Sequence, residues 1–211
     1  MKIIYTAGEG EVTEKKSRFI ATVRPVTSQE EAESFILEMK KKYWDARHNC
    51  YAWILGERGE SQRASDDGEP QGTAGKPMLA VLTGMELTNV CVVVTRYFGG
   101  VLLGTGGLVR AYSAATQAGL ENSVVLEKIP GYKVTIGTDY NGIGKIQYIL
   151  MQNQHPILDT EYTDIVKVTA LVPEEEMGKL TSLITEATAA RAAIEQEAVC
   201  FGYADGEAVI L

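Results

Sequence analysis

The chain has 211 residues, of which 45% are hydrophobic and 23% charged, with a formal net charge of -8 at pH 7. This is the composition of an ordinary soluble globular protein large enough for one large or two small domains. No apolar run approaches the roughly 18 residues of a membrane span, and residues 1 to 6 turn polar too soon for a secretion signal. We therefore expect a cytoplasmic protein.

The charge is spread unevenly along the chain. Residues 1 to 129 carry 15 Lys and Arg against 16 Asp and Glu, whereas residues 130 to 211 carry 5 against 12. A nucleic-acid surface needs local positive potential, because neutralised phosphates supply most of the non-specific affinity. The first half is therefore the better candidate for such a partner.

The three cysteines, Cys50, Cys91 and Cys200, are odd in number, far apart and lack a Cys-x-x-Cys pair. This pattern favours reduced thiols and argues against a structural zinc site. We expect Cys50 and Cys91 to be small buried hydrophobic residues, since both lie in strand-like runs.

In chain order, the first half alternates strands and helices. Ser28 and Glu31 have the spacing of a capping box before an apolar 3.6-residue period. Strands are predicted at 2–5, 19–23, 48–55, 90–94 and 123–128, and helices at 29–43, 77–84 and 108–121. Residues 56 to 76 show no apolar period and are predicted to be one long loop, a length that is usually functional or disordered.

The second half predicts a ferredoxin-like fold, because its elements follow the order β-α-β-β-α-β. Strands are predicted at 132–136, 157–162, 165–172 and 193–203, and helices at 142–152 and 174–190. Ile129-Pro130-Gly131 is typical of a linker and coincides with the change in charge. We expect two α+β domains, residues 1–129 and 130–211.

A glycine-rich stretch follows the apolar strand that ends at Val94. The glycines are Gly99, Gly100, Gly104, Gly106 and Gly107, and a helix is predicted to begin near Leu108. Backbone N–H groups at such a place can face an anion, although the glycines are equally well explained by a tight turn. The spacing fits neither the Walker loop nor the dinucleotide fingerprint.

Arg96 and Arg110 flank this stretch. Arg110 would lie in the first turns of the helix, where the dipole is already positive. A cation there is unfavourable without a negative group opposite, so we expect a carboxylate or a phosphate beside it.

Asp66, Asp67 and Glu69 place three carboxylates within four residues, an arrangement that needs cations or hydrogen-bond donors nearby. They could hold Mg²⁺ or act in acid–base chemistry, with His48 moving a proton. Alternatively they accept backbone N–H groups of their own turn and pair with Arg47, Arg96 or Arg110. We favour the second interpretation and expect no cofactor, with Mg²⁺ as the alternative.

These motifs together resemble one known family. The stretches Lys16–Phe19, Asp45–Ala52, Ser65–Gly75 and Thr95–Tyr112 are similar to the IMPACT family in its bacterial, YigZ-type form. The resemblance covers nearly all of residues 15 to 125, and the second half is similar to the C-terminal domain of that form.

The resemblance implies an N-terminal α+β sandwich of a type shared with a small-subunit ribosomal protein domain and with ribonuclease P protein. It implies a C-terminal domain like one of elongation factor G. The eukaryotic relatives are translation regulators that bind the large activator protein of the amino-acid-starvation kinase and restrain that kinase. The family supplies no catalytic residues to carry over.

Three functions remain open, the third being a purely structural docking module whose motif residues only stabilise a long loop. The first is a non-enzymatic binding protein linked to translation, whose partner is RNA or a ribosome-associated protein. The second is a metal-assisted enzyme acting on a phosphorylated or peptide-like small molecule, with His48, Asp66, Asp67 and Glu69 in its site. The anion- or partner-binding residues of the first are predicted to be Arg47, Arg96, Tyr97, Gly99, Gly100, Gly104, Gly106, Gly107 and Arg110.

Overall fold

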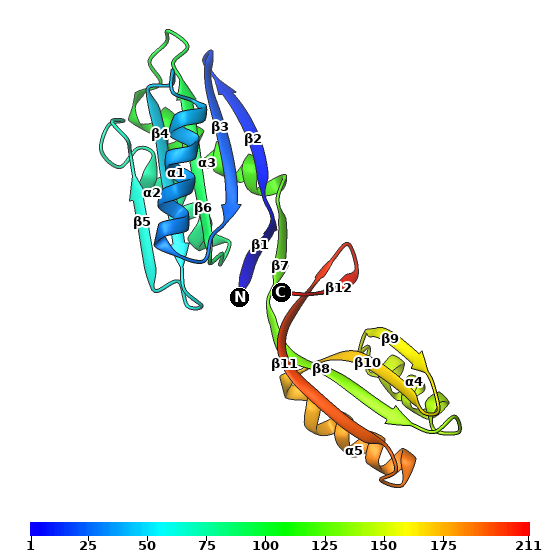
Figure 1. Cartoon of the computed structure of the whole chain (residues 1–211). Coiled ribbons are helices and arrows are strands. Elements are labelled where there is room, and N and C mark those ends of the chain that lie inside the picture. Colours follow the sequence, from blue (N-terminus) through cyan, green and yellow to red (C-terminus); the bar gives the residue numbers. More distant parts are fainter. The chain divides into compact units, whose positions relative to one another are not determined.

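The computed structural model describes all 211 residues and divides the chain into two compact units, Met1–Glu127 and Lys128–Leu211 (Figure 1). Both units mix helices with antiparallel strands, as the predicted α+β class requires. No helix is long and apolar enough to cross a membrane.

The first unit is built on a five-stranded antiparallel sheet. Its strands, in spatial order, are β2 (Gly8–Glu14), β3 (Ser17–Pro25), β6 (Val90–Tyr97), β4 (His48–Leu55) and β5 (Ser61–Ser65). A separate antiparallel pair joins β1 (Lys2–Thr6) to β7 (Val124–Glu127), so the two ends of this unit meet.

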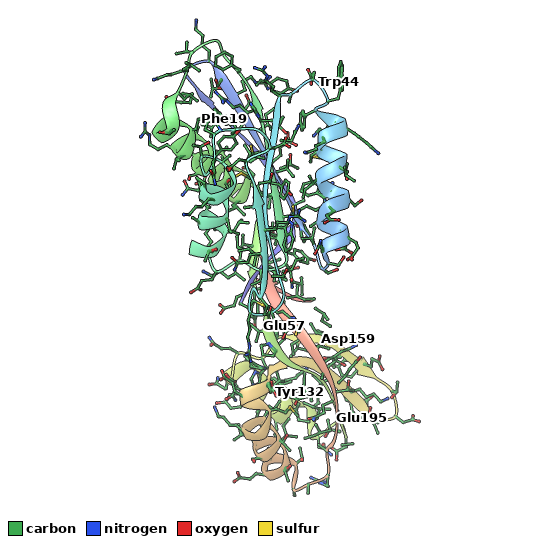
Figure 2. The ribbon with its side chains drawn as sticks, turned by 90° about the vertical axis from the view of Figure 1, so that its left-hand side faces the viewer. Phe19, Trp44, Glu57, Tyr132, Asp159 and Glu195 are labelled. Carbon is green, nitrogen blue, oxygen red and sulfur yellow. The ribbon has the colours of Figure 1, made fainter.

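Helices cover both faces of this sheet (Figure 2). On one face lies α1 (Gln29–Lys42), and on the other lie α2 (Gly75–Gly84) and α3 (Gly104–Glu121). The alternation predicted for β4 explains why both faces need cover. Cys50 and Ala52 pack in the core with α2 and α3, whereas Trp53 and Leu55 pack in the core with α1.

Two predictions for the first unit are corrected. Residues 56 to 76 are not one loop, because β5 pairs with β4 within them. This edge strand is polar and exposed, so it carries no apolar period for sequence reasoning to detect. Strand β2, which is also largely exposed, was missed for the same reason.

The helix predicted to begin near Leu108 begins at Gly104 instead. Gly104, Gly106 and Gly107 therefore belong to its first turn and not to the preceding loop. Glycine disfavours a helix interior, and this masked the true start in the sequence.

The second unit has the strand order β12-β11-β8-β10-β9, all antiparallel. Its strands are β8 (Ile129–Thr138), β9 (Ile157–Tyr162), β10 (Val166–Pro173), β11 (Ala193–Ala204) and β12 (Glu207–Ile210). Its helices are α4 (Ile143–Gln152) and α5 (Met177–Thr188), the latter preceded by the 3₁₀ turn η1 (Glu174–Glu176).

The predicted ferredoxin-like order is present, with β12 added at one edge. The prediction of a linker at residues 129 to 131 is wrong, because these residues open β8 and pair with β11. The core joins Val134 and Ile136 of β8 to side chains of both helices, including Ile146 and Ile184.

Candidate functional site

A cleft of about 620 Å³ opens in the first unit where the start of β4, the end of β6, the turn after β5 and the start of α3 meet. One side is polar and the other apolar. The polar and small lining residues are Arg47, His48, Gly68, Glu69, Pro70, Arg96, Gly104 and Thr105, and the apolar ones are Phe98, Leu102, Leu103 and Leu108.

Glu69 is the centre of the polar side. Its Oε1 accepts hydrogen bonds from Arg96 Nη1 at 2.6 Å and from the Tyr112 hydroxyl at 2.8 Å. The side chains of Glu69 and Arg96 are only 3% and 8% exposed. This is a buried ion pair with excellent geometry, the case in which removing one partner is costly.

Arg96 is also enclosed by aromatic rings. Its guanidinium lies 5.3 Å from the Phe19 ring centre and 5.6 Å from that of Phe98. Its Nε is buried and has no hydrogen-bond partner within the protein. The arginine therefore lines the cleft while most of its charge is already balanced by Glu69.

His48 has a fixed tautomer. Its Nδ1 lies 2.9 Å from the carbonyl oxygen of Asp67, and only a protonated Nδ1 can donate to a carbonyl. In the neutral ring Nε2 is then an acceptor, 4.0 Å from Glu69 Oε1. Gly68 passes the ring with φ +87, and a side chain on it would be strained there.

Asp66 is turned toward its own loop. Its carboxylate accepts the N–H groups of Gly72, Ala74 and Gly75 at 2.8 to 3.0 Å, so it caps α2 from outside the helix. Burial raises the pKa of Asp66, but the three N–H donors outweigh burial and hold this pKa below its usual value.

Asp67 has different partners again. It accepts the Asn49 N–H at 2.7 Å and pairs with Lys40 at 2.6 Å. No three His, Cys, Asp or Glu side chains are placed so that they could hold a metal ion together. The alternative in which Asp66, Asp67 and Glu69 jointly hold Mg²⁺ does not fit this geometry, and the hydrogen-bonding interpretation does.

Three of the nine predicted anion- or partner-binding residues line the cleft: Arg47, Arg96 and Gly104. Arg47 is exposed and has neither a hydrogen bond nor an ion pair from its side chain. Tyr97 is turned to another partner, because its hydroxyl donates to Asp45 at 2.8 Å.

Most of the predicted glycines are explained by close packing or by backbone conformation. A side chain on Gly99 would collide with the backbone of Lys16, and its N–H donates to Ser17 at 3.1 Å. Gly100 takes φ +84 in open space, which suits a turn. Gly106 and Gly107 lie within α3, and Gly107 is buried.

No carboxylate of the chain pairs with Arg110, and a phosphate beside it stays a prediction. Arg110 lies in the second turn of α3, is exposed and has no hydrogen bond or ion pair. Its Nη1 lies 3.6 Å from the place a side chain on Gly106 would occupy. Water screens an exposed cation from the helix dipole, so no carboxylate is needed there.

The first turn of α3 offers backbone N–H donors that no side chain caps. Leu103 precedes the helix without a side-chain cap, and its first turn holds no acid. Gly104 and Thr105 line the cleft, so the uncapped start of this turn lies at a site that also contains Arg47. Together they suit a carboxylate or a phosphate.

An apolar loop adjoins these donors. Phe98 is 54% exposed and Leu102 is 83% exposed, and Val101 between them is exposed as well. Leu102 was not among the predicted site residues, although the run Val101-Leu102-Leu103 within a glycine-rich stretch was a visible signal.

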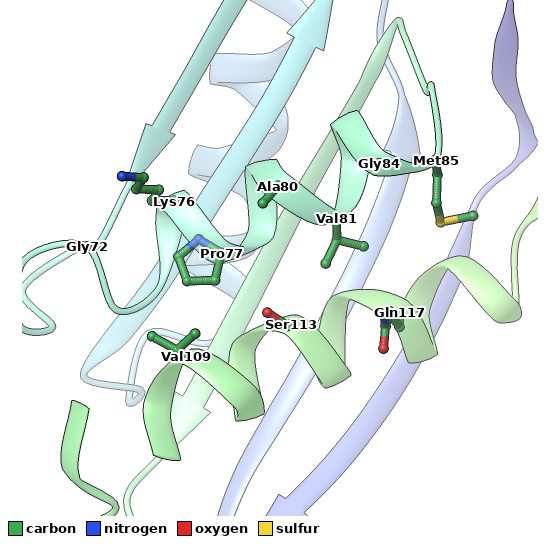
Figure 3. A pocket seen from close by; sticks show the side chains of 10 residues that line it. All are labelled: Gly72, Lys76, Pro77, Ala80, Val81, Gly84, Met85, Val109, Ser113 and Gln117. Atoms are coloured by element: carbon green, nitrogen blue, oxygen red, sulfur yellow. The ribbon is translucent and has the colours of Figure 1, made fainter. Parts of the chain in front are cut away.

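A second hollow of the first unit lies between α2 and α3 (Figure 3). It measures about 800 Å³, and Pro77, Val81 and Val109 give it a largely apolar lining. Lys76 is the sole charged residue that lines it. The chemical groups that could bind an anion therefore gather at the first cleft.

These features define a two-domain α+β protein with a ferredoxin-like second domain and a cleft that offers donors and apolar surface. Residues 15–120 match the Impact N-terminal domain, and residues 136–191 match the Domain of unknown function (DUF1949). The chain belongs to the IMPACT family, as its motifs predicted.

The similarity to curated relatives extends over nearly the whole chain. The chain is 41% identical over 190 residues to the IMPACT family member YvyE of Bacillus subtilis, covering 90% of this chain and 88% of the relative. It is 37% identical over 174 residues to the IMPACT family member YigZ of Escherichia coli, covering 82% and 85%.

A solved structure described as that of a hypothetical protein is similar with a TM-score of 0.59 and 33% identity. That similarity covers 92% of this chain and 95% of the other.

Proposed function

We propose that this protein is a non-enzymatic regulatory protein linked to translation, and that the cleft of its first domain binds a segment of a protein partner. The segment carries a carboxylate next to apolar side chains. The observation that carries the proposal is the placement, at one cleft, of the unpaired Arg47, the uncapped start of α3 and the exposed loop with Phe98 and Leu102.

The chemistry of the cleft supports an acidic and apolar ligand. A carboxylate can accept hydrogen bonds from Arg47 and from the first N–H groups of α3 together. Phe98 and Leu102 can then bury apolar surface of the same segment, which accounts for their exposure in the free protein.

A protein partner is favoured over RNA by the charge of the cleft. Of its two arginines, Arg96 is already paired with Glu69 and only Arg47 is unpaired. Residues 1 to 129 carry no net positive charge, as counted above, whereas RNA binding rests on several unpaired cations. The experiment must therefore distinguish RNA from a protein partner.

The link to translation rests on the family. The eukaryotic IMPACT proteins are translation regulators that act through a protein partner, as the resemblance implies. In this chain we infer a ribosome-associated protein as the partner, and the cleft as the place where that protein is held.

The test is co-sedimentation of the full chain with purified ribosomes. The double variant Arg47→Glu with Leu102→Asp changes two exposed residues of the cleft and leaves the buried network intact. We expect it to lower ribosome affinity by about tenfold or more, equivalent to roughly 1.4 kcal/mol, since hot-spot contacts often exceed that.

The matched control is Arg58→Glu with Leu37→Asp. These residues are also exposed, with unpaired side chains, and neither lines the cleft. The control should bind like the wild type, and naked ribosomal RNA should not displace the wild type. Equal co-sedimentation of both variants would place binding elsewhere, and complete displacement by RNA would make RNA the partner.

A further inference from the structure

Strand β9 forms one edge of the sheet in the second unit, and its outer side pairs with no other strand. An unpaired edge presents backbone donors and acceptors to any extended chain, and proteins usually blunt it with proline or lysine. β9, with the sequence Ile-Leu-Asp-Thr-Glu-Tyr, contains neither residue.

The side of β9 that faces the helices is apolar. Thr160 and Tyr162 lie opposite Val168 and Val166 of β10, both fully buried. A bulge brings Ile157 opposite the buried Ala170, so Ile157 joins the same side. Tyr162 is exposed, and its ring lies 6.4 Å from that of Tyr140.

Helix α4 extends this apolar surface. Tyr148 and Met151 are 60% and 65% exposed. With Ile157 they line a hollow of about 770 Å³. A strand added along β9 would place every second side chain on this side of the sheet.

The opposite side of β9 carries two carboxylates, with Lys167 of β10 opposite the second of them. Asp159 and Glu161 are both exposed and lie on the side of the sheet away from α4. The N–H of Thr160 donates to Asp159 Oδ1 at 2.8 Å. This local bond can be replaced by a bond from the same N–H to a carbonyl oxygen of an added strand. The whole second half is acidic, with 12 Asp and Glu against 5 Lys and Arg from residue 130 onward.

We propose that the edge of β9 binds an extended segment of a partner protein in which apolar and basic side chains alternate. The apolar side chains would pack beside Ile157 and the exposed residues of α4. The basic ones would pair with Asp159 and Glu161 on the other side.

A second copy of this chain does not meet these requirements. If β9 paired with another β9 and kept like sides together, Asp159 or Glu161 would lie opposite an acidic residue of the other copy. Like charges directly opposite each other destabilise a strand pair. The acidic side therefore selects a basic partner strand and disfavours self-association.

The experiment measures binding of labelled seven-residue peptides to the full chain by fluorescence anisotropy. One peptide alternates Val and Lys, a second has the same composition in two blocks, and a third alternates Val and Glu. We expect the alternating basic peptide to bind about tenfold tighter than either other peptide, because each cross-strand charge pair contributes several tenths of a kcal/mol.

Thr160→Pro and Thr160→Ala form a matched pair. The proline removes the N–H that is not bonded to β10, a change tolerated at an edge strand, whereas the alanine keeps it. We expect Thr160→Pro to lose about tenfold in affinity and Thr160→Ala to bind like the wild type. Met151→Asp, an exposed change on α4, should weaken binding even if the proline variant fails to fold.

Three results would overturn the proposal. These are equal affinity for the alternating and block peptides, full binding by Met151→Asp, and a concentration-dependent dimer that Thr160→Pro abolishes. The last would make a second copy the occupant of the edge.

Discussion

Glu69 holds together the polar side of the cleft, because Arg96 and Tyr112 both donate to one of its oxygens. In Glu69→Ala the Arg96 guanidinium would stay buried without its counter-ion. We expect a loss of about 3 kcal/mol in the free energy of unfolding, measured by urea denaturation.

The matched control is Glu38→Ala, which breaks the ion pair between Glu38 and Arg24. Those side chains are 52% and 39% exposed, so the loss should stay below about 1 kcal/mol. Equal losses in the two variants would contradict the role given to the buried pair.

Cysteine reactivity follows from burial. Burial raises the pKa of the Cys91 thiol to about 12 and raises that of Cys50 further still. Cys200 is only partly buried. We expect a thiol reagent at pH 8 to label Cys200 alone in the folded protein and all three cysteines in denaturant. Rapid labelling of Cys50 in the folded state would contradict its burial in the core.

For single residues, the sequence predicted which side chains belong to the polar site but not all of their hydrogen-bond partners. Pairing of Glu69 with one of three arginines was predicted, whereas the hydroxyl of Tyr112 was not, since no local pattern marks a contact 43 residues away. The carboxylate expected beside Arg110 does not pair with it, since sequence position on a helix does not say whether water screens the side chain.

Among the elements, α2 depends on a residue outside itself. Asp66 accepts the N–H groups of Ala74 and Gly75 at its start, and that of Gly72 in the preceding turn. We expect Asp66→Ala to lower stability by about 1 to 2 kcal/mol, measured by urea denaturation at pH 7. Asp66→Asn, which keeps a carbonyl acceptor, should lose less.

The effect of Asp66 should depend on pH. Its pKa in the folded protein lies below its unfolded value of about 3.9, so its stabilisation is complete above that value and is lost as the pH falls through the lower folded pKa. The stability difference between wild type and Asp66→Ala should therefore shrink on acidification below about pH 4. A pH-independent difference would show that the charge of Asp66 is not what caps α2.

Most elements with a strong apolar pattern were predictable, and most exposed strands were not. The bounds of β4 and β9 agree with the prediction, because β4 is apolar from Cys50 to Leu55 and turn residues flank both strands. Strands β2, β5 and β12 lack such a pattern, and their positions are set by pairing with a neighbour. The glycine-rich start of α3 is likewise fixed by tertiary packing.

For the whole molecule, each unit has its own hydrophobic core, and β1 pairs with β7 to close the first. We therefore expect residues 1–127 alone to fold, with a cooperative urea transition and the thiol protection of Cys50 and Cys91 retained. A fragment that is soluble but shows no cooperative transition would contradict two independent domains.

The most direct test of the proposed function is a hydrogen-exchange comparison of the full chain with and without ribosomes. We predict slower exchange at residues 98 to 105, where the apolar loop meets the start of α3, and no such change in the Arg47→Glu, Leu102→Asp variant. Binding that leaves exchange at these residues unchanged in the wild type would contradict the assignment of this cleft as the partner site.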